Sequence, residues 1–205
     1  MGMGINFASY EEFKKTLTDE ENRFLEPERK AYFVHPGYAD TIMWLCWMSK
    51  AKNIVEIGVG HSTIPLLLAA RRNEAKLFST DIACESHEYT VKELWKYPHT
   101  ENWTVECGID SLDMVKKWQG GEIEFLYLDS SHAYEHTKKE LEAWMPLLKV
   151  GGWMLCHDVT SNVDLVFRAI SEFIMRRDNK FFYEYYHLPD YYGFGVLVKR
   201  NLNVL

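Results

Sequence analysis

The sequence predicts an α/β domain built on a seven-stranded, mostly parallel β-sheet with helices on both faces. Short apolar runs alternate with amphipathic stretches through five successive β-α units, and right-handed crossovers place such helices on both sides of a sheet. The run Phe125-Leu126-Tyr127-Leu128 is apolar throughout, as in strands buried on two faces. The last two apolar runs have no helix between them, which predicts an antiparallel C-terminal hairpin at one edge.

The expected elements follow one another without a linker or an internal repeat. Strands are expected at 53–57, 76–81, 103–107, 124–129, 153–157, 180–186 and 193–199. Helices are expected at 65–72, 85–96, 111–118, 133–144 and 163–174, the last having a regular 3.6-residue apolar period. Pro65 suits a first helical turn, where its missing N–H is not needed.

Residues 1–50 are expected to form an N-terminal helical cap in front of a core at 51–205, so that residues 1–205 are one domain. Two S/T-x-x-E capping boxes, at 9–12 and 18–21, predict two short helices, and a third helix is expected at 39–48. Pro27 and the pair Pro36-Gly37 are expected to break the chain between them.

Composition restricts the class of partner. The chain has 205 residues, 47% of them hydrophobic, and a net charge of −7, which disfavours nucleic acid or anionic lipid as the main partner. No signal peptide or membrane span is apparent. The four cysteines form no C-x-x-C pair, which favours buried thiols in a reducing compartment, and we expect a cytoplasmic protein. The oligomeric state, a homo-oligomer included, stays open.

The segment after the first strand, V-E-I-G-V-G-H-S-T at 55–63, is typical of a ligand-binding turn. Gly58 and Gly60 allow a tight turn and close approach of a ligand, and the following helix offers free N–H groups. A dinucleotide fingerprint requires a third glycine, where this chain has Thr63, and an acid, Glu56, precedes the first glycine. A glycine turn with no ligand is the alternative.

The next two strand ends carry further candidates for nucleoside binding. Asp81 can accept hydrogen bonds from both ribose hydroxyls, although acids at strand ends are also common without a ligand. Gly108 permits close approach after the third strand, beside Ile109. Asp110 or Ser111 can bond an adenine edge or, equally, cap the helix that follows.

Acids and histidines gather after the fourth and fifth strands. Adjacent parallel strands bring Asp129 and Asp158 side by side, where two carboxylates repel unless a cation or a proton intervenes. With His157 they form a candidate site for Mg²⁺ or, given the imidazole, Mn²⁺. His132 is the candidate base that takes a proton from a hydroxyl. The alternative is that His132 caps a helix and His157 packs in the core.

These motifs resemble those of known enzymes. The pattern E-x-G-x-G at 56–60 resembles motif I of class I S-adenosylmethionine (SAM)-dependent methyltransferases, which have a Rossmann-like fold. The stretch at 125–159, F-L-Y-L-D-S-S-H-A-Y-E-H-T-K-K-E-L-E-A-W-M-P-L-L-K-V-G-G-W-M-L-C-H-D-V, looks like the metal-dependent small-molecule O-methyltransferases of the macrocin and mycinamicin type. The ending G-F-G-V-L-V-K-R at 193–200 is similar to their last strand. The likeness covers about 34–200.

The resemblance implies SAM as the cofactor and a divalent metal. The SAM-binding residues are then expected to be Glu56, Gly58, Val59, Gly60, Ser62, Thr63, Asp81, Gly108, Ile109, Asp110, Ser111 and Asp129. It implies Asp129, His157 and Asp158 as metal ligands and His132 as the base. The chain departs from the family in having Ser130, where glycine is frequent, and His157, where glutamate is frequent.

The sequence thus predicts methyl transfer to a hydroxyl of a small-molecule acceptor, whose identity it does not reveal. Three alternatives stay open. They are a methyltransferase without a metal, an NAD-type oxidoreductase on the same fold, and a non-catalytic nucleoside-binding module.

Overall fold

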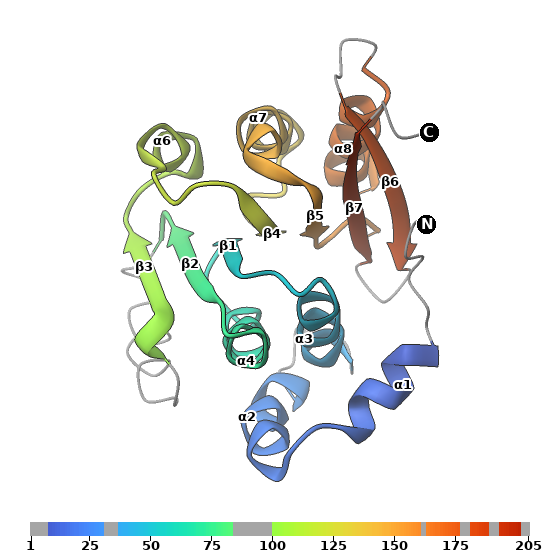
Figure 1. Ribbon diagram of the computed structural model, residues 1–205. Helices are drawn as coiled ribbons and strands as arrows, with labels where there is room; N and C mark the ends of the chain where they lie inside the picture. The colour runs from blue at the N-terminus through green and yellow to red at the C-terminus, as the bar shows by residue number, and fades with distance from the viewer. Residues whose placement is uncertain are drawn as a thin grey trace.

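The computed structural model in Figure 1 describes residues 8–30, 37–83, 100–160, 163–176, 181–188 and 193–201. Its seven strands form one sheet in the order β3-β2-β1-β4-β5-β7-β6. The pairs β1·β2, β1·β4, β2·β3 and β4·β5 are parallel, whereas β7 is antiparallel to β5 and to β6. The predicted sheet and its C-terminal hairpin are confirmed.

The strand bounds agree closely with the prediction at one edge of the sheet. The strands β1 (Asn53–Ile57), β2 (Lys76–Asp81) and β3 (Trp103–Cys107) have the predicted bounds, and β4 (Ile123–Leu128), β6 (Phe181–Leu188) and β7 (Phe194–Asn201) differ by a residue or two. The strand β5 (Leu148–Cys156) starts earlier than predicted, because Leu148 pairs with Ile123 before a register shift. The bulge keeps the glycine pair at 151–152 inside the strand.

Helices cover both faces of the sheet. One face carries α3 (Tyr38–Met48) and α4 (Thr63–Asn73), with α1 (Ala8–Lys15) and α2 (Asp19–Lys30) outside them (Figure 1). The opposite face carries α6 (Ser111–Lys117), α7 (Tyr134–Trp144) and α8 (Arg168–Ile174). Short helical turns lie at η1 (Thr100–Asn102), η2 (Met145–Leu147) and η3 (Val163–Phe167). The helix predicted at 85–96 lies outside the described residues.

Three local predictions for the helices were wrong. The helix expected at 163–174 begins as the π-helical turn η3, which its regular apolar spacing did not reveal. Ser9 lies inside α1 and donates to the sulfur of Met48 instead of capping the helix. Pro27 lies within α2. Two residues past Pro27, Arg29 forms two hydrogen bonds with Asp40 of α3, at 2.5 and 2.8 Å, which hold the end of α2 against α3.

The second capping box was confirmed. Thr18 and Glu21 form the reciprocal capping box of α2: the Glu21 carboxylate accepts from the Thr18 N–H at 2.8 Å, and the Glu21 N–H donates to the Thr18 hydroxyl at 3.2 Å. Among the described residues, no helix has the length and apolarity needed to cross a membrane.

The cysteines only partly follow the prediction of buried thiols. Cys46 and Cys156 are buried and free. Cys107 is exposed at the end of β3 and forms a disulfide, whose partner lies outside the described residues. The expectation of reduced, buried thiols is therefore wrong for Cys107.

The turn after β1 is packed against the end of β4. Gly58 has a φ of +96°, and a Cβ on it would lie 2.0 Å from the carbonyl oxygen of Asp129. Its N–H donates to the carbonyl of Thr80 at 2.9 Å, so the ends of three strands meet at this residue. Only glycine combines this backbone conformation with such close contact.

A fully buried carboxylate supports the same turn from behind. Glu56 accepts hydrogen bonds from the hydroxyls of Ser62 at 2.6 Å, Thr63 at 3.0 Å and Ser79 at 2.6 Å. Burial raises the pKa of Glu56 to about 7, although these hydroxyls act to lower it. Through these hydrogen bonds the carboxyl group holds the start of α4 and the strand β2 against β1.

We predict that Gly58→Ala destabilises the fold by at least about 2 kcal/mol, because an alanine there requires both a left-handed backbone and movement of Asp129. Gly60→Ala is the matched control, since a Cβ at Gly60 has no atom within 4 Å and its φ is not positive. Its free energy of unfolding should stay within about 0.5 kcal/mol of the wild type. Equal losses in the two variants, measured by denaturant unfolding, would contradict the steric argument.

We predict that Glu56 makes stability fall as pH rises from about 4.5 to about 7. In this window the folded protein keeps the proton, because the pKa of Glu56 is raised to about 7, while the unfolded chain releases it near the ordinary value of 4.5. Between about pH 4.5 and 7, the free energy of unfolding of the wild type should therefore fall by about 3 kcal/mol relative to that of Glu56→Gln. Glu106→Gln, at an exposed position of β3, is the control. A pH-independent difference between wild type and Glu56→Gln would refute the prediction.

Candidate cofactor and catalytic site

A cavity of about 660 Å³ opens where the carboxyl ends of the parallel strands meet. Twelve of the residues predicted for the site line it: Gly58, Val59, Gly60, Ser62, Asp81, Ile109, Asp110, Ser111, Asp129, His132, His157 and Asp158. The three others, Glu56, Thr63 and Gly108, do not line the cavity. Glu56 and Thr63 lie behind the turn, where they bond to each other. One cavity therefore collects residues from five successive strand ends, as expected for a parallel sheet.

Asp81, at the end of β2, connects two loops of the cavity wall. One of its carboxylate oxygens accepts from the N–H of Val59 at 2.8 Å and the other from the N–H of Ala83 at 2.6 Å. Its side chain therefore organises the glycine turn and also lines the cavity. Binding of a ribose by Asp81 stays a prediction.

The loop after β3 forms the wall next to Asp81. Gly108 has a φ of +73° and donates its N–H to the carbonyl of Asp81 at 2.9 Å. Asp110 caps α6 by accepting from the N–H of Leu112 at 2.8 Å, which was the structural alternative for this residue. Asp110 and Ser111 nevertheless line the cavity, so a contact with adenine stays a prediction for both.

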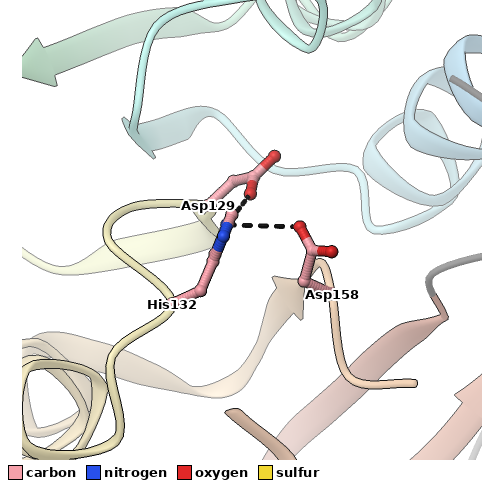
Figure 2. Close-up of side chains that lie close together, drawn as sticks. All are labelled: Asp129, His132 and Asp158. Carbon is pink, nitrogen blue, oxygen red and sulfur yellow. Dashed lines mark hydrogen bonds and ion pairs between the residues drawn. The ribbon is translucent and has the colours of Figure 1, made fainter. Parts of the chain in front are cut away.

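Two aspartates and two histidines converge on the side of the cavity formed by β4 and β5. His132 Nε2 lies 2.8 Å from Asp129 Oδ1 and 3.2 Å from Asp158 Oδ2, so the ring bridges the two carboxylates (Figure 2). His157 Nδ1 lies 3.0 Å from Asp158 Oδ2 and 3.5 Å from Asp129 Oδ2. The backbones of His132 and Asp158 have positive φ angles of 55° and 61°, a strained conformation that is frequent at functional sites.

The charges of this cluster stabilise one another. Burial acts to raise the pKa of Asp129, but the hydrogen bonds from His132 and His157 hold it below its ordinary value. The hydrogen bond to Asp129 raises the pKa of His132. Burial acts to lower the pKa of His157, yet Asp129 and Asp158 raise it to about 9. Without a metal ion these shifts favour the protonated form of both imidazoles, whose positive charge offsets the repulsion between two adjacent carboxylates.

The donor set also suits a divalent cation. One ligand atom each from Asp129, His132 and Asp158 lies within 4.8 Å of the others. Two carboxylate oxygens and an imidazole nitrogen are ligands accepted by Mn²⁺, and the carboxylates alone suit Mg²⁺. The nitrogen ligand expected from the sequence is His157, whose Nδ1 lies 3.0 Å from Asp158 Oδ2 and 3.5 Å from Asp129 Oδ2, and this assignment stays a prediction.

Two tyrosines that the sequence analysis did not single out support Asp129. Tyr127 donates to Asp129 Oδ2 at 3.0 Å, and the hydroxyls of Tyr38 and Tyr127 are 2.7 Å apart. The ring of Tyr38 also packs edge-on against His157 at 4.9 Å between centroids. The two-residue spacing of Tyr127 and Asp129 in a strand could have indicated a shared face. No local pattern identifies Tyr38, which comes from α3.

A second buried carboxylate joins the loops after β3 and β4. Glu140 on α7 accepts from Ser130 at 2.6 Å, from Ser111, and from His136 at 3.1 Å. The i,i+4 spacing of His136 and Glu140 was a usable signal, because it places both on one helical face. Glu140 thereby fixes the loop that carries Asp129 relative to the loop that carries Ile109.

Comparison with known proteins identifies the family. A family model described as a methyltransferase domain matches residues 55–159, just over half of the chain. No curated protein matches the chain significantly. Solved structures that match include the SAH-bound methyltransferase PaMTH1 of Podospora anserina, with a TM-score of 0.68 and 16% identity over 98% of this chain and 100% of that one.

Two O-methyltransferases are similar in fold. TomG of Streptomyces achromogenes, solved with SAM, has a TM-score of 0.69 and 14% identity over 95% of this chain and 96% of its own. The O-methyltransferase of Bacillus cereus, solved with SAH, has a TM-score of 0.67 and 17% identity over 94% and 97%. The matched region runs from β1 to the residue after Asp158 and so contains the glycine turn and both aspartates. The chain therefore belongs to the methyltransferase-domain family and is a SAM-dependent methyltransferase of the class I, Rossmann-like fold.

Proposed function

We propose that the protein transfers the methyl group of SAM to a hydroxyl of a small molecule, assisted by a divalent cation. The observation that carries the proposal is the convergence of two aspartates and two histidines on the cavity wall. His157 Nδ1 lies 3.0 Å from Asp158 Oδ2 and 3.5 Å from Asp129 Oδ2, and His132 Nε2 lies 2.8 Å from Asp129 Oδ1. Similar structures named as O-methyltransferases support transfer to oxygen. The net charge of −7 favours a small acceptor over nucleic acid.

In this proposal SAM lies across the ends of the first three strands. Asp81 accepts from the ribose, and the loop from Ile109 to Ser111 contacts the adenine. Gly58, Val59 and Gly60 allow close approach of the methionyl part. This arrangement directs the sulfonium and its methyl group towards Asp129, so that the acceptor lies over β4 and β5. Alignment of donor and acceptor then supplies much of the rate enhancement.

In this proposal the cation would be held by the three ligands that the family resemblance implies, Asp129, His157 and Asp158. A divalent cation lowers the pKa of a hydroxyl bound to it and fixes the direction of its oxygen. His132 takes the proton from the acceptor. Its side chain is 34% exposed and that of His157 only 12%, so His132 is more accessible to an acceptor. Asp129 orients His132 through its 2.8 Å hydrogen bond.

We predict that Asp158→Asn lowers the affinity for Mn²⁺ and Mg²⁺ by at least roughly a hundredfold, because it removes one of two anionic ligands. Turnover should fall with it, while SAM affinity stays unchanged. Calorimetric titration of each metal ion, with and without SAM, measures both. Asp113→Asn is the control, since Asp113 is an exposed acid paired with Lys116 on α6. Full activity in the presence of a chelator would disprove the role of the cation.

We predict that substitution of His132 lowers mainly kcat, whereas substitution of His157 lowers mainly the affinity for the metal ion. His132→Gln should lower kcat by roughly a hundredfold or more at saturating metal, with metal affinity kept, because the proton acceptor is lost. His157→Gln should lower metal affinity and recover part of its activity at high metal concentration. The thermal midpoint of each variant controls for misfolding, since His157 packs on Tyr38. A loss of metal affinity in His132→Gln, with a loss of kcat alone in His157→Gln, would contradict this assignment.

A further inference from the structure

The side chains around the cavity carry an unusual set of charges. Four acids and four histidines line it, and none of the described lining residues is a lysine or an arginine; the eight are Asp81, Asp110, Asp129, Asp158, His61, His132, His136 and His157. SAM brings a sulfonium, an ammonium and a carboxylate. The two cationic groups suit a cavity rich in acids. The carboxylate of SAM requires a donor, and the histidines are the only side chains of the described lining that can supply a positive charge.

Three of these histidines are engaged elsewhere. His132 and His157 lie between Asp129 and Asp158, where a further carboxylate would be repelled. His136 is held by Glu140 at 3.1 Å and lies 3.4 Å from the hydroxyl of Ser111, in the loop proposed for adenine. None of the three lies in the glycine turn.

His61 has the position and the free edge that the carboxylate needs. It follows Gly60 in the turn after β1, and its side chain is 47% exposed at the cavity. Nδ1 lies 2.6 Å from Glu28 Oε2, and Glu28 is the only partner found for this ring among the described residues. The opposite edge of the ring, with Nε2, is then available to donate to a ligand.

The partner of His61 comes from the N-terminal helices. Glu28 lies on α2, and its side chain is only 10% exposed. Its hydrogen bond raises the pKa of His61, which burial acts to lower, so the ring is more readily charged. Arg29, the next residue of α2, is fastened to Asp40 on α3 by two hydrogen bonds, which fix the helix that presents Glu28.

We propose that His61, oriented by Glu28, binds the carboxylate of the methionyl part of SAM. The position of the carboxylate follows from the proposed positions of the nucleoside and the methyl group of SAM. With the nucleoside at Asp81 and the methyl group directed towards Asp129, the amino-acid part of SAM lies at the turn after β1, which carries His61. Glu28 is a positioning residue, because it acts through the ring of His61. The inference rests on SAM binding by the family and on the placement of SAM in the proposed function, and not on the acceptor or on a metal ion.

The test compares two ligands that differ only in the carboxylate. Calorimetric titrations of SAM and of decarboxylated SAM, without acceptor or divalent cation, are made on wild type, His61→Gln and Glu28→Gln. His61→Gln should weaken SAM binding about tenfold, as expected for loss of a charge-assisted hydrogen bond, and leave decarboxylated SAM unaffected. Glu28→Gln should weaken SAM binding less, with the same selectivity for the carboxylate.

His136→Gln is the matched control, because it removes another histidine of the cavity wall without touching the glycine turn. It should change the affinities for the two ligands by the same factor. If His61→Gln weakened both ligands equally, or neither, the assignment of the carboxylate to His61 would be overturned. These measurements are independent of methyl transfer to oxygen and of metal binding, so failure of either proposal leaves the other testable.

Discussion

The contact between the turn after β1 and the end of β4 is the constraint on which the site depends. Gly58 leaves room for the backbone of Asp129, whose N–H in turn donates to the carbonyl of Ile57 at 2.9 Å. The segment that approaches the cofactor and the residue at the centre of the acidic cluster are therefore joined through backbone alone. Their separation does not depend on side-chain rotamers, which suits a reaction that needs accurate alignment.

Two buried carboxylates hold the segments around the cavity together through hydrogen bonds. Glu56 accepts hydrogen bonds from Thr63 of α4 and Ser79 of β2, and Glu140 accepts them from Ser111 of α6 and from Ser130 in the loop after β4. A buried acid is costly unless its oxygens are satisfied, so each of these residues stabilises the fold only while the surrounding loops keep their positions. The positions of these segments in the cavity wall therefore depend on one another.

Much of the fold could be predicted from the sequence because short apolar runs alternate along it with stretches that have the apolar period of a helix. The early start of β5 could not, since it depends on pairing between Leu148 and Ile123 across a bulge. Pro27 predicts a break where α2 in fact continues. The end of α2 beyond it is held by Arg29, which bonds to Asp40 of another helix, and a local pattern does not record such a contact.

The sequence by itself determined the sheet, its hairpin and the acids and glycines at the strand ends, because hydrophobic periodicity is a local property and parallel strands end at one edge. Only the tertiary structure decided which side chains those residues meet. Tyr38 reaches Tyr127, and Glu28 reaches His61, across 89 and 33 positions of the chain. Such pairs depend on how helices pack on the sheet, and no periodicity in a single sequence records that packing.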